Sequence, residues 1–173
     1  MSAPGPGGIG AVLARMAGGL KQQAFVVTDI KDAKAALRQS FGCTKFFEFE
    51  STVPWELRGR EVQCDLKLAF GRSGNMQIEL IQPVAGEGLH FDLLTARGPG
   101  AHHLGFYVDD LDGLAAAAAA DGFPPIMSSG MGTSRYCYLD TIDTLGLYLE
   151  LIEDPDDMMT KMMPWWDDPI TVA

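Results

Sequence analysis

Four side chains that can bind a metal ion stand at related places in this sequence, each inside a run of residues typical of a β-strand. Together they supply one imidazole, two carboxylates and one amide. This set of nitrogen and oxygen donors suits zinc, nickel, cobalt, manganese or magnesium. A metal held by them would polarise a bound carbonyl group and make the neighbouring C–H bond more acidic. The four residues are Gln22, Glu79, His103 and Glu150.

The sequence around these residues is repeated, and the repeat relates them in two pairs. A Phe-x-Val-x-Asp pattern starts at Phe25 and again at Phe106, 81 residues later. A Glu-Leu-Ile pattern starts at Glu79 and again at Glu150, 71 residues later. Two matching ends in the same order, each around a predicted helix, indicate two copies of one module, the second with shorter loops.

Strand geometry predicts that the four candidates share one face of a sheet. Side chains alternate between the two faces of a strand, and the hydrophobic residues of these strands have the parity of the opposite face. The small residues Ala24 and Gly105 leave room beside Gln22 and His103. A single glutamate on a strand is usually exposed to solvent. Repeat-related positions for all four residues favour a shared site instead.

The hydrophobic pattern predicts one strand, one helix and three strands in each half of the chain. In the first half we expect strands at 22–27, 46–51, 61–70 and 76–82, with a helix that ends at Gly42. In the second half we expect strands at 103–108, 126–127, 136–140 and 145–152, with an alanine-rich helix at 111–120. Residues 54–59 are predicted to form a loop or hairpin, and residues 9–20 a short helix.

These boundaries predict a single domain of the α+β class over residues 1–173. It consists of module one at about 21–84, a connector at 85–100, module two at about 101–155 and a C-terminal tail at 156–173. The tail is rich in methionine and tryptophan, which would be costly to expose to water. We therefore expect the tail to pack on its own domain or on a second subunit.

The composition disfavours several classes of partner. The formal net charge of -10 disfavours nucleic acid and anionic membranes, which bind basic surfaces. No hydrophobic run approaches the ~20 residues of a membrane span, and the N-terminus, which lacks a basic residue, does not resemble a signal peptide. The three cysteines form no CxxC motif, which favours unpaired thiols in a reducing cytoplasm.

The chain resembles the vicinal oxygen chelate superfamily over about residues 20–155. The resemblance rests on the strand opening His103-Leu104-Gly105-Phe106 and the strand closings Ile78-Glu79-Leu80 and Leu149-Glu150-Leu151. It implies two βαβββ modules that form an eight-stranded, cup-shaped mixed sheet with helices on the outer face and one divalent metal ion inside. The four candidate residues are similar to the ligands of eukaryotic-type glyoxalase I. The connector at 98–103 looks more like that of the methylmalonyl-CoA epimerase branch.

The resemblance implies a metal-dependent lyase or isomerase, of the glyoxalase I or epimerase type. Its substrate would be a small α-oxygenated carbonyl compound or thioester chelated to the metal, with glutathione or CoA as a possible part. Glu150 is the expected base, and Glu79 a metal ligand or second base. Gln22 stands where the dioxygenases of this superfamily have histidine, so an iron site with two histidines is not implied.

A second class of function stays open from the sequence. Bleomycin resistance proteins share this fold, are dimeric and sequester a cationic ligand without catalysis, which the charge of -10 suits. We favour the enzyme, because a sequestering protein does not need a complete ligand set. Either protein would act on a small molecule as a homodimer. The residues expected to line the cup are Trp55, Phe106, Tyr107, Tyr136 and Tyr138, with Arg58, Arg60 or Arg135 available for a substrate carboxylate or phosphate.

Overall fold

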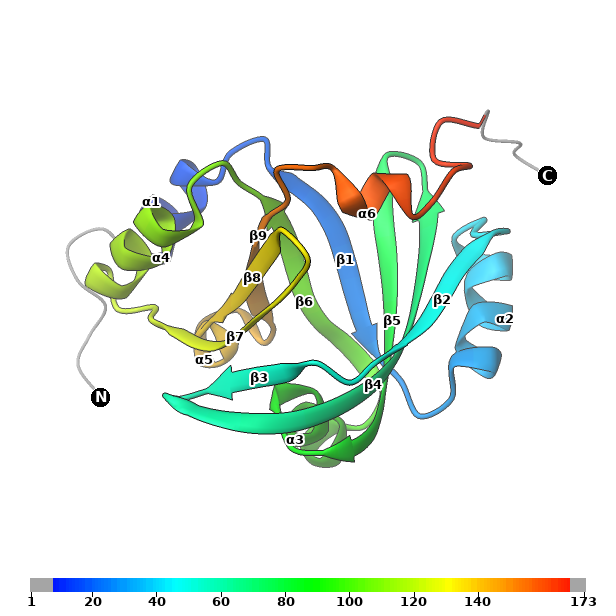
Figure 1. The fold of residues 1–173 in the computed structure, drawn as a ribbon, viewed down its shortest axis with the longest axis horizontal. Coiled ribbons are helices and arrows are strands. Elements are labelled where there is room, and N and C mark those ends of the chain that lie inside the picture. The colour runs from blue at the N-terminus through cyan, green and yellow to red at the C-terminus, as the bar shows by residue number, and fades with distance from the viewer. Residues whose placement is uncertain (1–7, 169–173) are drawn as a thin grey trace.

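The computed structural model describes residues 8–168, and its strands close into a barrel (Figure 1). The first half contains β1 (Leu20–Val26), α2 (Ile30–Ser40), β2 (Phe46–Ser51), β3 (Pro54–Leu57), β4 (Arg60–Ser73) and β5 (Met76–Gly86). The second half contains β6 (Gly100–Tyr107), α4 (Leu111–Ala120), β7 (Pro125–Met131), β8 (Ser134–Leu139) and β9 (Tyr148–Glu153). The remaining described helices are α1 (Gly8–Arg15), α3 (Leu89–Arg97), α5 (Ile142–Leu145) and α6 (Met158–Lys161).

The sheet is mixed, and its two halves have the same internal connections. β1 is parallel to β5 in the first half, as β6 is to β9 in the second. The halves meet through the antiparallel pairs β1–β6 and β3–β7, and the pair β4–β5 completes the ring. The predicted eight-stranded mixed sheet is confirmed. It carries one additional strand, because the second strand of the first half is divided into β2 and β3, which both pair with β4.

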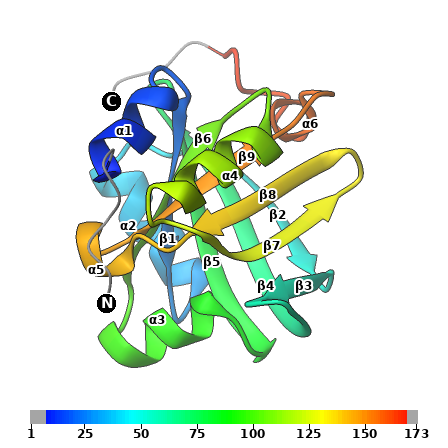
Figure 2. The same cartoon turned by 90° about the vertical axis from the view of Figure 1, so that its left-hand side faces the viewer.

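Helices cover the outside of the barrel, as the alternation of hydrophobic residues predicts. α2 packs on β5, where the outward-facing Ile78 and Leu80 are buried. α4 packs on β9 in the same way, over the two leucines that flank Glu150. Glu79 and Glu150 lie between these outward-facing residues and therefore face the inside. Figure 1 shows α2 on one side of the barrel, and Figure 2 shows α4 and α1 on the other.

Several element boundaries differ from the predicted ones. The N-terminal helix ends at Arg15 rather than at residue 20, because Gly18 and Gly19 follow it. β7 has seven residues rather than two, since it pairs with β8 along its length. The last strand begins at Tyr148, because a short helix and Gly146, which has a φ of 75°, precede it. The predicted hairpin at 54–59 is present and contains β3.

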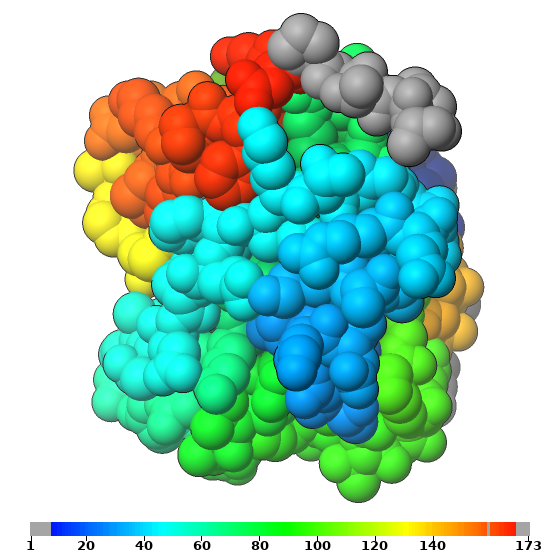
Figure 3. All heavy atoms as spheres, turned by 90° about the vertical axis from the view of Figure 1, so that its right-hand side faces the viewer, coloured from blue at the N-terminus to red at the C-terminus, as the bar shows by residue number. Residues whose placement is uncertain are grey.

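The C-terminal segment lies along one rim of the barrel (Figures 1 and 3). Met163 is buried in the cluster of hydrophobic residues inside the barrel, and Trp165 and Trp166 pack against that cluster. The guanidinium group of Arg72 lies 5.4 Å from the ring centre of Trp166. These contacts hold the segment on its own domain.

The three cysteines are buried and form no disulfide with one another. No helix within residues 8–168 has the length and hydrophobicity needed to cross a bilayer. Residues 1–7, on which the signal-peptide prediction depends, lie outside the described part of the chain.

Candidate metal centre

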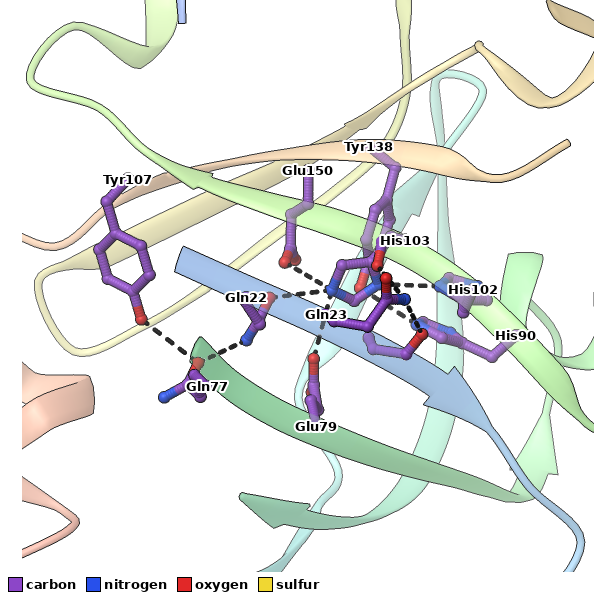
Figure 4. Close-up of polar contacts among 11 residues, drawn as sticks. Gln22, Gln23, Gln77, Glu79, His90, His102, His103, Tyr107, Tyr138 and Glu150 are labelled. Carbon is purple, nitrogen blue, oxygen red and sulfur yellow. Dashed lines mark hydrogen bonds and ion pairs between the residues drawn. The ribbon is translucent and has the colours of Figure 1, made fainter. Parts of the chain in front are cut away.

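Four adjacent strands bring the four candidate residues to one point inside the barrel. The strands lie in the order β9, β6, β1 and β5, and they carry Glu150, His103, Gln22 and Glu79 respectively. The Nε2 atom of His103 lies 2.9 Å from Gln22 Oε1, 3.0 Å from Glu150 Oε2 and 3.3 Å from Glu79 Oε2 (Figure 4). The structure therefore brings all four side chains together. Their role as metal ligands stays a prediction.

The spacing of these atoms fits a divalent metal ion. Nitrogen and oxygen ligands lie about 2.1 Å from such an ion, so neighbouring ligands are about 3.0–3.4 Å apart in octahedral or tetrahedral geometry. The three distances from His103 Nε2 fall close to that range. One ligand atom from each of Glu79, His103 and Glu150 lies within 4.8 Å of the others. The two carboxylates would balance the charge of the ion.

The candidate centre is buried, and its charges act strongly on one another. Glu79 is 7% exposed, Glu150 5% and His103 0%. Burial raises the pKa of Glu79, an effect that His103 opposes and Glu150 increases. Burial lowers the pKa of His103, but Glu150 and Glu79 outweigh this effect and raise it to about 9. At neutral pH a metal ion must therefore displace a proton from His103 before it can bind.

Gln77, which sequence analysis did not identify, fixes the orientation of Gln22. The Gln22 Nε2 group donates a hydrogen bond of 2.7 Å to Gln77 Oε1, so the oxygen of the Gln22 amide faces His103. The Tyr107 hydroxyl donates to the same Gln77 oxygen at 3.5 Å. Gln77 stands two positions before Glu79 on β5, and the alternation of strand residues could have placed it on the inner face.

His102 was also missed, because strict alternation places it on the opposite face from His103. Ala24 of β1 pairs with His103 and Phe25 pairs with Ala101, so His102 is the extra residue of a β-bulge in β6. Its side chain is 0% exposed, and its Nδ1 atom lies 2.9 Å from Nδ1 of His103. The bulge thus brings both imidazoles into the same buried cluster.

The contact between the two imidazoles defines the protonation of each ring. One of the two Nδ1 atoms must donate and the other accept. Burial, together with His90 and His103, lowers the pKa of His102 well below its usual value, so His102 is neutral. His103 has a proton on Nδ1 whether it is charged or bound to a metal through Nε2. His102 therefore accepts from His103 and holds its ring with Nε2 directed at the carboxylates.

His90, from helix α3, continues the cluster behind His102. The rings of His90 and His102 are stacked with their centres 4.6 Å apart. His90 Nε2 lies 3.3 Å from the Tyr138 hydroxyl, and its Nδ1 lies 3.7 Å from Cys64 Sγ. Burial, with a smaller effect of His103, lowers the pKa of His90 to about 3, so this ring is also neutral. All three histidines of the chain therefore lie in one buried group.

We expect the His102→Phe variant to bind a divalent metal about 10- to 100-fold more weakly than the wild-type protein, because phenylalanine keeps the ring but cannot accept from His103. Isothermal titration calorimetry with Zn²⁺ and Ni²⁺ measures this change. His90→Phe is the matched control, since His90 makes no hydrogen bond to His103. Equal losses in the two variants would mean that His102 acts only through packing.

Because Gly105 has no side chain, it leaves the space that Gln22 occupies. The sequence analysis expected small residues to leave such room. A Cβ atom built on Gly105 would lie 2.8 Å from Cβ of Gln22 and would collide with its amide oxygen. We expect Gly105→Ala to displace Gln22 and to weaken metal binding about tenfold. Gly100→Ala on the same strand is the control, because nothing lies within 4 Å of its added Cβ. Unchanged affinity in Gly105→Ala would show that the Gln22 amide is not a ligand.

A cavity opens beside the candidate centre, and Gln22, Glu79 and Glu150 form part of its wall. Trp55, Tyr136 and Tyr138 line it, as predicted. Phe106 does not, because it faces outward and is buried under α4. Tyr107 does not line it either, although its hydroxyl reaches Gln77.

The three arginines proposed for a substrate anion do not line the cavity either. Arg60 forms an ion pair with Glu87 at 2.5 Å. Arg135 pairs with Glu153 at 2.6 Å and with Asp112 at 3.1 Å. The side chain of Arg58 is exposed beside the turn after β3. This prediction was wrong, because Arg60 and Arg135 pair with carboxylates outside the barrel and Arg58 lies in an exposed turn.

Comparison with known proteins agrees with this fold. Residues 21–138 match the family model of the Glyoxalase/Bleomycin resistance protein/Dioxygenase superfamily. A search of curated protein sequences gives no significant match. The methylmalonyl-CoA epimerase from Mycobacterium tuberculosis is a similar solved structure. It has 22% sequence identity and a TM-score of 0.57, over 82% of this chain and 91% of that one.

Two other solved structures are similar over slightly less of the chain. A hypothetical protein from Bacillus halodurans C-125 has 22% identity and a TM-score of 0.61, over 79% of this chain and 94% of that one. A Streptomyces coelicolor methylmalonyl-CoA epimerase variant in complex with 2-nitronate-propionyl-CoA has 22% identity and a TM-score of 0.56, with the same coverage. At this identity the likeness concerns the fold. Because the family model covers more than half of the chain, the chain belongs to the Glyoxalase/Bleomycin resistance protein/Dioxygenase superfamily, as the resemblance predicted.

Proposed function

We propose that this protein is a metal-dependent isomerase or lyase that moves a proton on the carbon next to a carbonyl group of a small substrate. The main support for the proposal is that two buried carboxylates, those of Glu79 and Glu150, lie next to the imidazole of His103 at the wall of a cavity. A binding site without catalysis has no need for two buried carboxylates so close together, because each costs free energy to remove from water.

The proposed ligands are Gln22, Glu79, His103 and Glu150, around one divalent ion. When bound, the ion would act as a Lewis acid on the substrate oxygens. The donor set contains no thiolate and only one imidazole, which is compatible with zinc, nickel, cobalt, manganese or magnesium. His102 and Gln77 would hold His103 and Gln22 in the orientation that this role requires.

Glu150 and Glu79 are the proposed bases. Both side chains line the cavity, so both can reach a substrate inside it. In the proposed step, one carboxylate takes the proton from carbon while the C–H electron pair moves into the carbonyl group. Burial raises the pKa of Glu79, which makes it a stronger base than an exposed glutamate. Return of the proton to the same carbon or to its neighbour gives the epimerised or isomerised product.

Loss of the α-hydrogen signal in D₂O tests this reaction. Methylglyoxal–thiol adducts and methylmalonyl-CoA form the first panel, because they represent the two kinds of substrate to which the resemblance points. NMR would follow solvent deuterium entering the substrate in the presence of each metal. Exchange that requires both protein and metal supports the proposal. Absence of exchange with every metal and substrate class argues for a binding protein.

A non-catalytic sequestering protein is the second candidate, favoured by the aromatic wall of the cavity and the charge of -10. Metal analysis of the purified protein separates the two candidates. The enzyme is expected to retain about one metal ion per chain and to lose it on His103→Ala. A sequestering protein would bind its ligand equally well with and without metal.

The proposal includes the assembly and the location of the protein. We propose that it is a homodimer in the cytoplasm that acts on a small molecule. Light scattering of the purified protein at several concentrations tests the dimer, and a mass of one chain at all of them would contradict it.

A further inference from the structure

The hydroxyl group of Tyr138 lies next to the proposed base. Tyr138 on β8 and Glu150 on β9 are paired residues of antiparallel strands, so their side chains lie on the same face of the sheet. Both side chains line the cavity inside the barrel. Burial raises the pKa of Tyr138 well above its usual value, and the charge of Glu150 and a hydrogen bond to it act in the same direction. The hydroxyl is therefore protonated at neutral pH and can donate to the Glu150 carboxylate.

The repeat places a phenylalanine where the second module has this tyrosine. Phe70 on β4 is the antiparallel partner of Glu79 on β5, as Tyr138 is the partner of Glu150. Phe70 lines the same cavity with a ring of similar shape, but it has no hydroxyl group. An aromatic ring thus fills both places, and the two carboxylates differ in whether that ring offers them a donor. The hydroxyl of Tyr138 is an addition that acts on Glu150 alone of the pair.

Two further buried side chains extend the contact from the far side of the Tyr138 hydroxyl. His90 Nε2 lies 3.3 Å from Oη of Tyr138 (Figure 4). His90 Nδ1 lies 3.7 Å from Sγ of Cys64. Burial lowers the pKa of His90 to about 3 and raises the pKa of the Cys64 thiol to about 12. Both groups are therefore neutral at physiological pH, and each has one proton to donate.

The Glu150 carboxylate sets the direction of each hydrogen bond in this chain. It forms an ion pair with His103 at 3.0 Å, and a carboxylate can only accept. A hydrogen bond to a charged acceptor is about twice as strong as one to a neutral acceptor, so the single proton of Tyr138 is directed at Glu150 rather than at His90. The Tyr138 oxygen then accepts from the Nε2–H group of His90. The Nδ1 atom of His90 in turn accepts from the Cys64 thiol.

We propose that Tyr138 is a positioning residue, whose hydroxyl holds the Glu150 carboxylate in the orientation in which it takes the substrate proton. The buried chain from Cys64 through His90 keeps that hydroxyl directed at the carboxylate. The inference rests on the proposed function, which makes Glu150 a base. A carboxylate with a second donor keeps one orientation relative to the substrate, and a small misplacement of a reacting group can lower a rate about a hundredfold.

The position of the proton on His90 tests the chain without metal or substrate. We expect the neutral ring to have its proton on Nε2, because Nδ1 accepts from Cys64. A proton–nitrogen NMR correlation spectrum of the imidazole rings in the metal-free protein shows which nitrogen is protonated, and the His90→Phe variant identifies the signals. A proton on Nδ1 would overturn the proposal, because Nε2 would then accept the proton of Tyr138 and leave Glu150 without it.

The Tyr138→Phe variant tests the effect on the reaction. Phenylalanine keeps the ring, as Phe70 does in the first module, and removes only the hydroxyl group. With the metal-loaded protein, we expect kcat for deuterium exchange to fall about 10- to 100-fold and KM to change less than about twofold. A hydroxyl that only bound the substrate would change KM instead.

Tyr148→Phe is the matched control, because Tyr148 is buried against Tyr138, with ring centres 6.3 Å apart, but does not line the cavity. We expect its kcat to change less than about twofold. Unchanged kcat in Tyr138→Phe, or equal losses in the two variants, would overturn the positioning role even though the wild-type protein exchanges. Absence of exchange in the wild-type protein would instead overturn the proposed function and the positioning role together, while a proton on Nε2 of His90 would still support the chain.

Discussion

We expect the Glu150→Gln variant to exchange the substrate C–H proton about a thousandfold more slowly than the wild-type protein. Glutamine keeps the size of the side chain and can still offer an oxygen to a metal, but it cannot accept a proton. Deuterium incorporation at saturating substrate measures the change. Metal content should fall much less than the rate, which distinguishes a base from a residue that is only a ligand.

Glu153→Gln is the matched control for this experiment. Glu153 lies on the same strand, outside the barrel, where its carboxylate accepts from Arg135 at 2.6 Å. The same substitution there should change the exchange rate less than about twofold, since exposed ion pairs contribute little. Equal exchange rates in Glu150→Gln and in the wild-type protein would exclude Glu150 as the base.

The second large effect is expected for metal binding in the His103→Ala variant. His103 Nε2 is the atom from which the other three candidate ligands lie 2.9–3.3 Å away, so its loss removes the centre of the arrangement. A metal at about a thousand times its Kd stabilises a protein by about 4 kcal/mol. We expect added metal to raise the Tm of the wild-type protein and to leave the Tm of His103→Ala unchanged.

The pH dependence of stability should reverse when metal is added. Without metal, the pKa of His103 is raised from 6.5 to about 9, so its contribution is fully present below pH 6.5. This contribution is lost as the pH rises from about 6.5 through about 9. Metal binding requires the deprotonated imidazole, so the stabilisation by metal grows over the same range. Urea unfolding at pH 6, 7.5 and 9, with metal and with chelator, measures both effects. Parallel pH profiles in the two conditions would contradict this account.

The strand pattern and the repeat predicted two equivalent modules and one shared face for the four side chains, and the family resemblance implied the closed sheet in which they meet. Glu79 and Glu150 each lie between residues that are buried under a helix, and alternation places them inside. The repeat relates β1 to β6 and β5 to β9, and these four strands are neighbours in the closed sheet. Such information is local and periodic, which is why it can be read from a sequence.

The residues around the centre depend on features that have no periodic signal. His102 enters the site through a β-bulge, which breaks the alternation that strand analysis assumes. His90 comes from α3 in the connector, and its contact with His102 depends on how that helix packs on the barrel. The predictions for Phe106 and Arg135 failed for a related reason. A residue type that suits a binding site gives no information on which face of a strand carries it.

Diffraction from crystals grown with a divalent metal, measured at the absorption edge of that metal, tests the central claim most directly. We predict one strong anomalous peak per chain inside the barrel. It should lie about 2.0–2.2 Å from Nε2 of His103 and from carboxylate oxygens of Glu79 and Glu150. The contradicting result would come from a crystal grown at saturating metal. It would show no peak at this position, and His103 would lie directly between the two carboxylates.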